Sequence, residues 1–238
     1  MPHLVTGSAY RHSGSFDGHC RNRKTMSAHL ATANSVVDTE WLKIASRAMN
    51  ISSNMSDFVL NDVGIIIADL PNRKMQAFPL EELLRYDPVM LGNQIYMSFK
   101  GKPVFLEHDN EDPLQAKGII LDTRMIHIPA YNVWKVHCLC GWDKTKDNAV
   151  ATAILNNELH TFSMGCWVDE FYCSVCGALD TFDELEIDGV IIPRCEHMRH
   201  LGEVFDGHLA YQNSSGCCFF ELSAVSQPAD ATAVGILL

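Results

Sequence analysis

The sequence predicts a mainly β protein with a few helices, of the α+β class. From residue 57 onward, short apolar runs alternate with Asn, Asp, Gly and Pro, which is the pattern of strands joined by turns. The segment 159–168 also alternates strictly, with one set of side chains apolar at every second position, as in a half-buried strand. Few segments carry helix signals. Both observations favour a β-rich core.

Each predicted element follows from its local pattern. Strands are expected at 58–60, 63–70, 94–99, 104–106, 118–121, 133–139, 159–168 and 218–225. In 159–168, Phe162 and Met164 lie on one face and Ser163 and Gly165 on the other. Helices are expected after Asp38, which can cap a segment around 41–49, at 79–84, where acids follow Pro79, and at 146–157.

Length and charge define the organisation and exclude some classes of function. At roughly 150 residues per domain, 238 residues predict one large domain or one domain with an insert. Residues 1–35 are predicted to be a loosely ordered leader and residues 36–238 the folded domain. A formal charge of -11 disfavours nucleic acid as a partner, and no apolar run approaches the roughly 20 residues of a membrane span. No secretion signal is seen, so we expect expression in a cytoplasm.

A Cys/His pattern predicts a zinc knuckle within residues 170–202. Cys173 and Cys176 form a Cys-x2-Cys turn closed by a glycine, and Cys195 with His197 or His200 would complete four ligands. The spacing does not choose between the two histidines, and we slightly favour His197. Four protein ligands leave no open position, so the zinc is expected to be structural, holding together an acidic hairpin with little apolar surface.

The nine cysteines are an odd number, and the remaining ones are interpreted as packed or incidental thiols. They are Cys20, Cys138, Cys140, Cys166, Cys217 and Cys218.

Three residues could supply the groups for acyl transfer. Ser163 lies in an apolar strand, His108 ends the run that begins at Gly101, where alternation puts it on the face of Val104 and Leu106, and Glu221 lies among aromatic residues. A carboxylate in such surroundings needs a partner to offset its desolvation, and an imidazole is a good candidate. The three would act as nucleophile, base and orienting acid. The sequence alone does not bring them together.

Four short blocks, read in order, carry a resemblance to a known family. They are Asp69–Asn72 with Phe78–Leu83, then Gly101–Asp109 followed by Gly118, then Phe162–Gly165, and finally Glu221–Ala229. On these blocks residues 63–234 resemble the prohead maturation proteases of tailed bacteriophages, which are similar in fold to the herpesvirus assemblin proteases. The zinc knuckle resembles an insert carried by some members from large phages.

The resemblance implies a β-barrel protease domain, with Ser163 as the nucleophile and His108 as the general base. It assigns the third position to Glu221, with Asp109 and Asp122 as rivals. The mechanism would also need an oxyanion hole, expected from backbone N–H groups, and no residue of the sequence identifies it. No cofactor is expected for catalysis. The resemblance further implies an enzyme packaged in the assembling prohead within the host cytoplasm, which cuts scaffold, core and capsid-protein propeptides, commonly after glutamate, and which can self-associate.

Other classes of function remain open from the sequence. One is a noncatalytic head or scaffold component that uses the zinc knuckle for docking. A nucleic-acid-binding zinc ribbon is disfavoured by the net charge and by the acidic loop. A catalytic-zinc hydrolase is disfavoured because no His-Glu-x-x-His motif is present.

Overall fold

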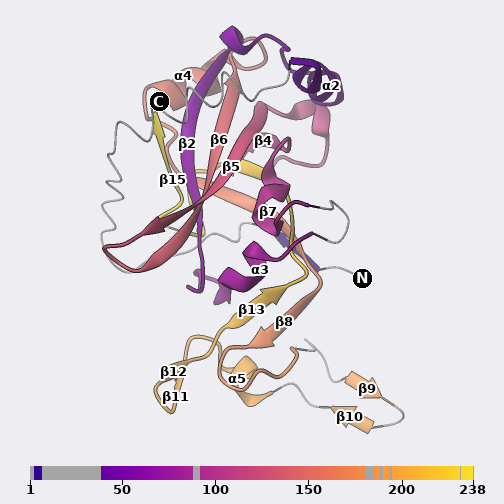
Figure 1. The fold of residues 1–238 in the computed structure, drawn as a ribbon, viewed down its shortest axis with the longest axis vertical. Helices are drawn as coiled ribbons and strands as arrows, with labels where there is room; N and C mark the ends of the chain where they lie inside the picture. The colour runs from indigo at the N-terminus through magenta and orange to yellow at the C-terminus, as the bar shows by residue number, and fades with distance from the viewer. Residues whose placement is uncertain are drawn as a thin grey trace.

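The central feature is an eight-stranded, strongly curled sheet (Figure 1). The computed structural model describes residues 3–6, 39–87, 92–180, 185–187, 190–192, 195–230 and 232–237. In spatial order the strands are β1 (His3–Thr6), β7 (Phe162–Val168), β14 (Cys218–Ala224), β4 (Pro103–Leu106), β5 (Gly118–Ile128), β6 (Val133–Asp143), β2 (Phe58–Ile67) and β15 (Val234–Leu237). All neighbours run antiparallel except β14 and β4, which are parallel.

The curl brings the far strand β15 back to β7. A bridge joins Thr161, just before β7, to Val234, and the amide of Phe162 donates to the carbonyl of Ala233 at 2.8 Å. The mainly β prediction is therefore confirmed as a curled sheet.

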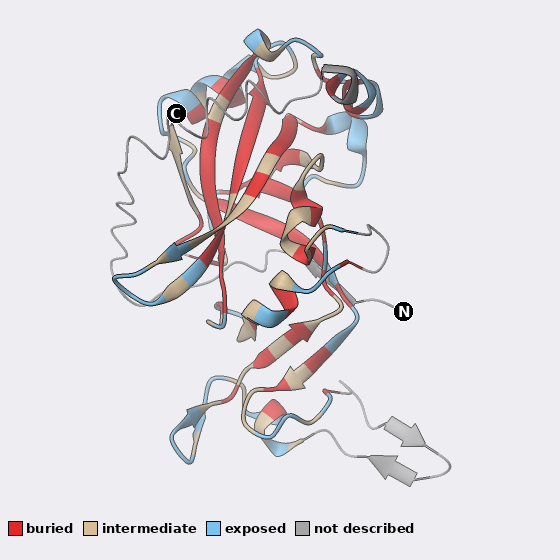
Figure 2. Cartoon of the chain, in the orientation of Figure 1, coloured by how far each residue is buried: buried red, intermediate tan, exposed pale blue. Residues whose placement is uncertain are grey.

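Apolar side chains pack on both faces of this sheet, so much of it is buried (Figure 2). The larger cluster fills the inside of the curl and includes Phe162, Met164, Leu222 and Val104. A smaller cluster lies on the opposite face, beneath helix α2 (Thr39–Met49). The two clusters explain why alternating strand residues are buried on both sides.

A second lobe extends from the end of the main sheet (Figure 1). Its three-stranded sheet contains β3 (Gln76–Ala77), β13 (Gln212–Ser215) and β8 (Glu170–Cys173). Around it lie the hairpin of β9 (Leu185–Ile187) and β10 (Val190–Ile192), helix α5 (Glu196–Arg199) and the hairpin of β11 (Val204–Phe205) and β12 (His208–Leu209). Because β8 follows β7 directly and β13 leads into β14, the segment from β8 to β13 is inserted in the sequence between two strands that are neighbours in the main sheet.

The other helices in the described part of the chain are short. They are α3 (Leu80–Leu84), α4 (Asn148–Leu155) and the 3-10 turns η1 (Met55–Asp57), η2 (Ile95–Phe99) and η3 (Pro113–Gln115). Helices expected at 79–84 and 146–157 are thus present. Asp38, the predicted cap of α2, lies outside the described residues, as does all of the predicted leader at 1–35 except residues 3–6. Among the described helices, none has the length and apolarity that crossing a membrane requires.

Two strand predictions are wrong for physical reasons. Within the segment 94–99, Ile95–Phe99 forms η2; the prediction failed because apolar composition by itself does not separate a strand from a buried helical turn. The runs 58–60 and 63–70 form one strand, β2, because the polar residues between them are paired rather than placed in a turn. Asn61 accepts a 2.8 Å hydrogen bond from the Trp142 indole, and Asp62 lies 3.1 Å from His137 Nδ1.

Candidate active site and metal centre

His108 sits in a tight turn that follows β4. Glu107 and His108 both adopt positive φ, of 50° and 59°, a conformation that costs non-glycine residues energy and is found where the surrounding structure enforces it. The Asp109 amide donates to the carbonyl of Leu106, and the Glu107 amide to that of Ala224. The turn therefore reverses the chain directly beside the end of β14.

This turn overturns the predicted facing of His108. Strand register places Val104 beside Leu222 and Phe105 beside Ser223, so Phe105 and Ser223 share a face. The imidazole lies against Glu221, two residues from Ser223 on that same face, which is opposite to the one that Val104 and Leu106 cover. Alternation failed because the strand ends at Leu106, before the histidine.

Glu221 is fully buried and has a partner at each oxygen. Its Oε1 lies 2.9 Å from His108 Nδ1, and its Oε2 accepts a 2.6 Å hydrogen bond from the Ser223 hydroxyl. Such pairing offsets the cost of burying a carboxylate. Sequence reasoning did not assign a role to Ser223, although its position two residues after Glu221 on one strand places both side chains on the same face.

Gly165 provides the space for this carboxylate. A Cβ built at Gly165 would lie 2.8 Å from Glu221 Oε1 and would also overlap the ring of Phe220. Any larger residue at this position would push Glu221 or Phe220 aside. The glycine two residues after Ser163 is therefore a steric requirement for the buried acid.

Ser163 lies beside this network. In the pairing of β7 with β14 it is directly opposite Ser223, a relation that puts Cβ atoms about 4.5–5.5 Å apart. Its side chain is only 1% exposed, and among the described residues its hydroxyl has no hydrogen-bond partner. Ser163 and His108 thus approach the same strand, β14, from its two sides, without a hydrogen bond between them.

The rival acids have other positions. Asp122 on β5 pairs with Lys100 Nζ at 3.3 Å. Asp109 is exposed, and within the described part of the chain Glu221 is the one carboxylate hydrogen-bonded to the His108 ring.

The second lobe brings four metal-ligand residues together. One ligand atom from each of Cys173, Cys176, Cys195 and His197 lies within 4.8 Å of the other three, so the cluster could hold a metal ion. His197 Nδ1 is 3.6 Å from Cys173 Sγ and 3.7 Å from Cys195 Sγ, and the sulfurs of Cys176 and Cys195 are 3.5 Å apart. A tetrahedral zinc with Zn–S of about 2.3 Å and Zn–N of about 2.05 Å would place two sulfurs about 3.8 Å apart and a sulfur and a nitrogen about 3.6 Å apart. The distances in the cluster are close to these values.

The local fold explains which histidine joins the cluster. Cys195 immediately precedes α5, so His197 is carried on its first turn, next to the Cys173–Cys176 loop, whose Gly177 has a φ of 71°. His200 lies at the other end of α5 and contacts Glu196 and Glu203 at 3.1 and 3.3 Å. The four residues that the sequence favoured are the ones the structure brings together.

The thiols of the cluster differ in acidity. A hydrogen bond from the backbone amide of Ala178 lowers the pKa of Cys176 to about 7, whereas burial raises the pKa of Cys195 to about 11. By contrast, Cys138 and Cys140 are fully buried in β6, where burial raises their pKa, as expected for packed thiols. Cys20 lies outside the described residues.

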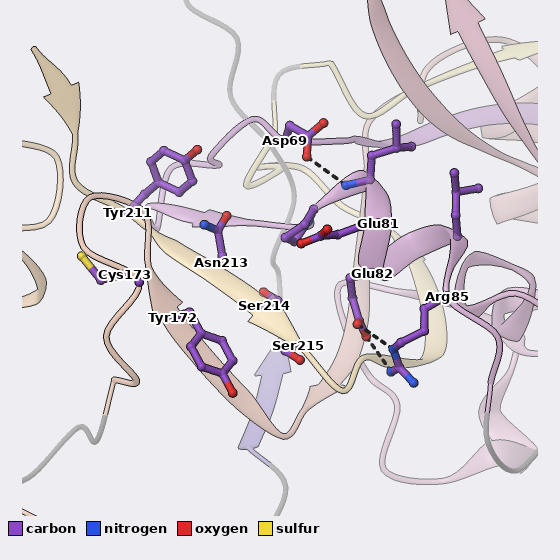
Figure 3. A pocket seen from close by; sticks show the side chains of 14 residues that line it. Asp69, Glu81, Glu82, Arg85, Tyr172, Cys173, Tyr211, Asn213, Ser214 and Ser215 are labelled. Carbon is purple, nitrogen blue, oxygen red and sulfur yellow. Dashed lines mark hydrogen bonds and ion pairs between the residues drawn. The ribbon is translucent and has the colours of Figure 1, made fainter.

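A cavity of about 1010 Å³ opens between α3 and the three-stranded sheet (Figure 3). Tyr172 and Asn213 line one wall, and Glu81 and the ion pair of Glu82 with Arg85, at 2.9 Å, line the other. His108, Ser163 and Glu221 do not line it. This cavity therefore lies on the side of the second lobe, and neither the serine nor the histidine lines it.

Comparison of the chain with protein-family models, with curated proteins and with solved structures found no match.

Proposed function

We propose that the protein is a serine endopeptidase in which Ser163 is the nucleophile, His108 the general base and Glu221 the orienting acid. The observation that carries the proposal is the hydrogen-bonded network in which His108 and Ser223 both contact the buried Glu221, with Glu221 and Ser223 on β14, the strand that pairs with β7 beside Ser163. A carboxylate bound at Nδ1 fixes the imidazole and leaves Nε2 to accept a proton.

The proposed reaction requires the side chains of His108 and Ser163, which share no hydrogen bond in the structure, to approach each other. The His108 side chain is 24% exposed, and the Ser163 hydroxyl has no competing partner among the described residues. Catalytic hydrogen bonds often form only when substrate is bound. Ser163 would attack the peptide carbonyl, His108 would take the hydroxyl proton and return it to the leaving amine, and Glu221 would stabilise the imidazolium.

The substrate class in this proposal comes from the resemblance of the sequence to prohead proteases. The substrates would be scaffold, core and capsid-protein propeptides cleaved during prohead maturation. Zinc at Cys173, Cys176, Cys195 and His197 would be structural, because four protein ligands leave no open coordination position. In that role it would hold the second lobe together and take no part in peptide cleavage.

Removal of the Ser163 hydroxyl tests the proposal. Ser163→Ala should abolish both propeptide cleavage and covalent labelling by a fluorophosphonate probe, with a loss of more than about 10³-fold, because no other group replaces the nucleophile. Ser214→Ala is the matched control, since it removes another buried strand hydroxyl without a partner among the described residues, on β13 in the second lobe, and should leave labelling at Ser163. Undiminished cleavage by Ser163→Ala would refute the assignment.

A second candidate is a noncatalytic head or scaffold component with a metal-stabilised docking lobe. The burial of Ser163 and the missing hydrogen bond to His108 favour it. This candidate predicts that neither the wild type nor a variant in which β1 is detached from β7 shows probe labelling or cleavage.

A further inference from the structure

Strand β7, which carries Ser163, has two edges with different neighbours. On one edge it pairs with β14, and the carbonyl of Thr161 accepts the amide of Val225 at 3.0 Å. On the other edge the amide of Phe162 donates to Ala233. Backbone groups of a strand alternate between its two edges, so Cys166, four residues after Phe162, faces this second edge as well.

Strand β1 occupies the second edge. It runs antiparallel to β7, from His3 opposite Val168 to Thr6 opposite Gly165, and ends two residues from Ser163. Ala233 covers the same edge on the far side of the serine. β1 and Ala233 therefore pair with this edge of β7 on either side of Ser163, where a strand from another peptide would otherwise pair.

We propose that this edge of β7 is a binding site for an extended peptide and that β1 fills it as an internal occupant. The proposal rests on the proposed function, because an endopeptidase must hold several residues of its substrate in an extended form beside the nucleophile. An exposed strand edge offers unpaired N–H and C=O groups to such a peptide. With β1 in place those groups are already paired, and Ser163 is only 1% exposed.

The register supplies a matched pair of variants. Val5 is opposite Cys166, whose backbone faces β1, so the backbone of Val5 faces β7. Leu4 is opposite Trp167, whose backbone faces β14, so the backbone of Leu4 faces away from β7. Proline lacks the N–H. Val5→Pro should thus break the pairing, whereas Leu4→Pro is tolerated because proline is accepted on an edge strand when its N side faces solvent.

The experiment compares the full-length wild type, Val5→Pro and Leu4→Pro. Val5→Pro should speed hydrogen exchange at the Cys166 amide by at least about 10-fold, because that amide loses its partner. It should also speed fluorophosphonate labelling of Ser163, whereas Leu4→Pro should match the wild type in both. A synthetic peptide with the sequence of residues 1–8, added to Val5→Pro, should restore protection and slow labelling, and a scrambled peptide should do neither.

The outcomes separate the two proposals. Equal hydrogen exchange at the Cys166 amide in Val5→Pro and the wild type would overturn the assignment of β1 as the occupant. If Ser163 is labelled at all, equal labelling rates in these two proteins would overturn it as well. Faster exchange that the added peptide reverses, without labelling in any variant, would support the peptide site on β7 and would refute the serine protease function.

Discussion

At the scale of single residues, Glu221 holds the candidate site together, because it is the hydrogen-bond partner of both His108 and Ser223. A buried carboxylate persists only when its oxygens are satisfied, and here His108 and Ser223 satisfy one oxygen each while Gly165 leaves the space. The histidine in turn depends on the turn at Glu107, where two consecutive residues adopt positive φ. The imidazole is thus oriented by a hydrogen bond and by a constrained backbone together.

Replacing Glu221 by glutamine keeps the volume but removes the charge. In Glu221→Gln an NH2 group that cannot accept a hydrogen bond replaces one carboxylate oxygen, so either Ser223 or His108 loses its acceptor and we expect the free energy of unfolding to fall by about 1–3 kcal/mol. Peptide cleavage should fall by about 10²–10⁴-fold, because the imidazole loses its orienting acid. Urea unfolding and cleavage kinetics would measure both effects.

Asp109→Asn is the control for Glu221→Gln, since Asp109 is the exposed rival acid beside His108. It should leave stability and activity near wild type. If Asp109→Asn abolished cleavage while Glu221→Gln retained it, the third position would belong to Asp109.

At the scale of elements, the metal-ligand lobe is made of pieces too small to be stable alone. Helix α5 has four residues, and each strand of its hairpins has two or three. The main sheet, in contrast, has its own apolar cores on both faces. We therefore expect metal binding to stabilise the lobe while the curled sheet folds without it.

Metal content and local protection test this expectation. The purified chain should carry one zinc per molecule, and Cys176→Ser should carry none, with faster hydrogen exchange across residues 170–215 and unchanged exchange in β5 and β6. Cys218→Ser, an exposed thiol outside the cluster, is the matched control and should retain the zinc. Equal zinc content in both variants would show that Cys176 is not a ligand.

At the scale of the whole molecule, the segment that leads into β15 closes the curl of the sheet. Lys135 on β6 is 5% exposed and donates to the carbonyl of Thr232 at 2.5 Å. Burial lowers the pKa of Lys135 to about 8, although the nearby carboxylates of Asp230 and Asp62 oppose that shift. A buried cation therefore ties β6 to the chain just before the bridge between Val234 and Thr161.

Lys135 predicts how stability depends on pH. Between pH 8 and pH 10.5 the unfolded chain still binds the lysine proton that the folded chain has lost. Raising the pH through this window should therefore increase the free energy of unfolding, by up to about 1.4 kcal/mol per pH unit.

The comparison of wild type with Lys135→Met isolates this effect, because the cysteines and tyrosines titrate in both proteins. Urea unfolding at pH 7.5 and 9.5 should show the stability of wild type rising relative to that of the variant. An identical pH dependence in the two proteins would contradict the assigned role of Lys135.

The sequence predicted some features well because their signals are local. The alternation around Phe162 and Met164 depends only on strand geometry, and a Cys-x2-Cys turn followed by a Cys/His pair predicts by spacing a cluster that could hold a metal ion. The facing of His108 was predicted incorrectly because a turn interrupts the alternation, and η2 was missed because its apolar residues are equally compatible with a strand. Asn61 and Asp62 were interpreted as a break in the strand because their partners are on β6.

The amino-acid sequence by itself determined the mainly β class, the strand that carries Ser163 and the three cysteines of the candidate metal cluster, with a choice of His197 or His200 for its fourth member. Each of these depends on neighbours within about 25 residues along the chain, with the strand period or a turn as its cause. Only the tertiary structure decided that His108 reaches Glu221, which lies 113 residues away in sequence, that Ser223 completes the network, and that β1 covers the edge of β7. Those contacts arise from sheet register and strand order, which short-range patterns do not encode.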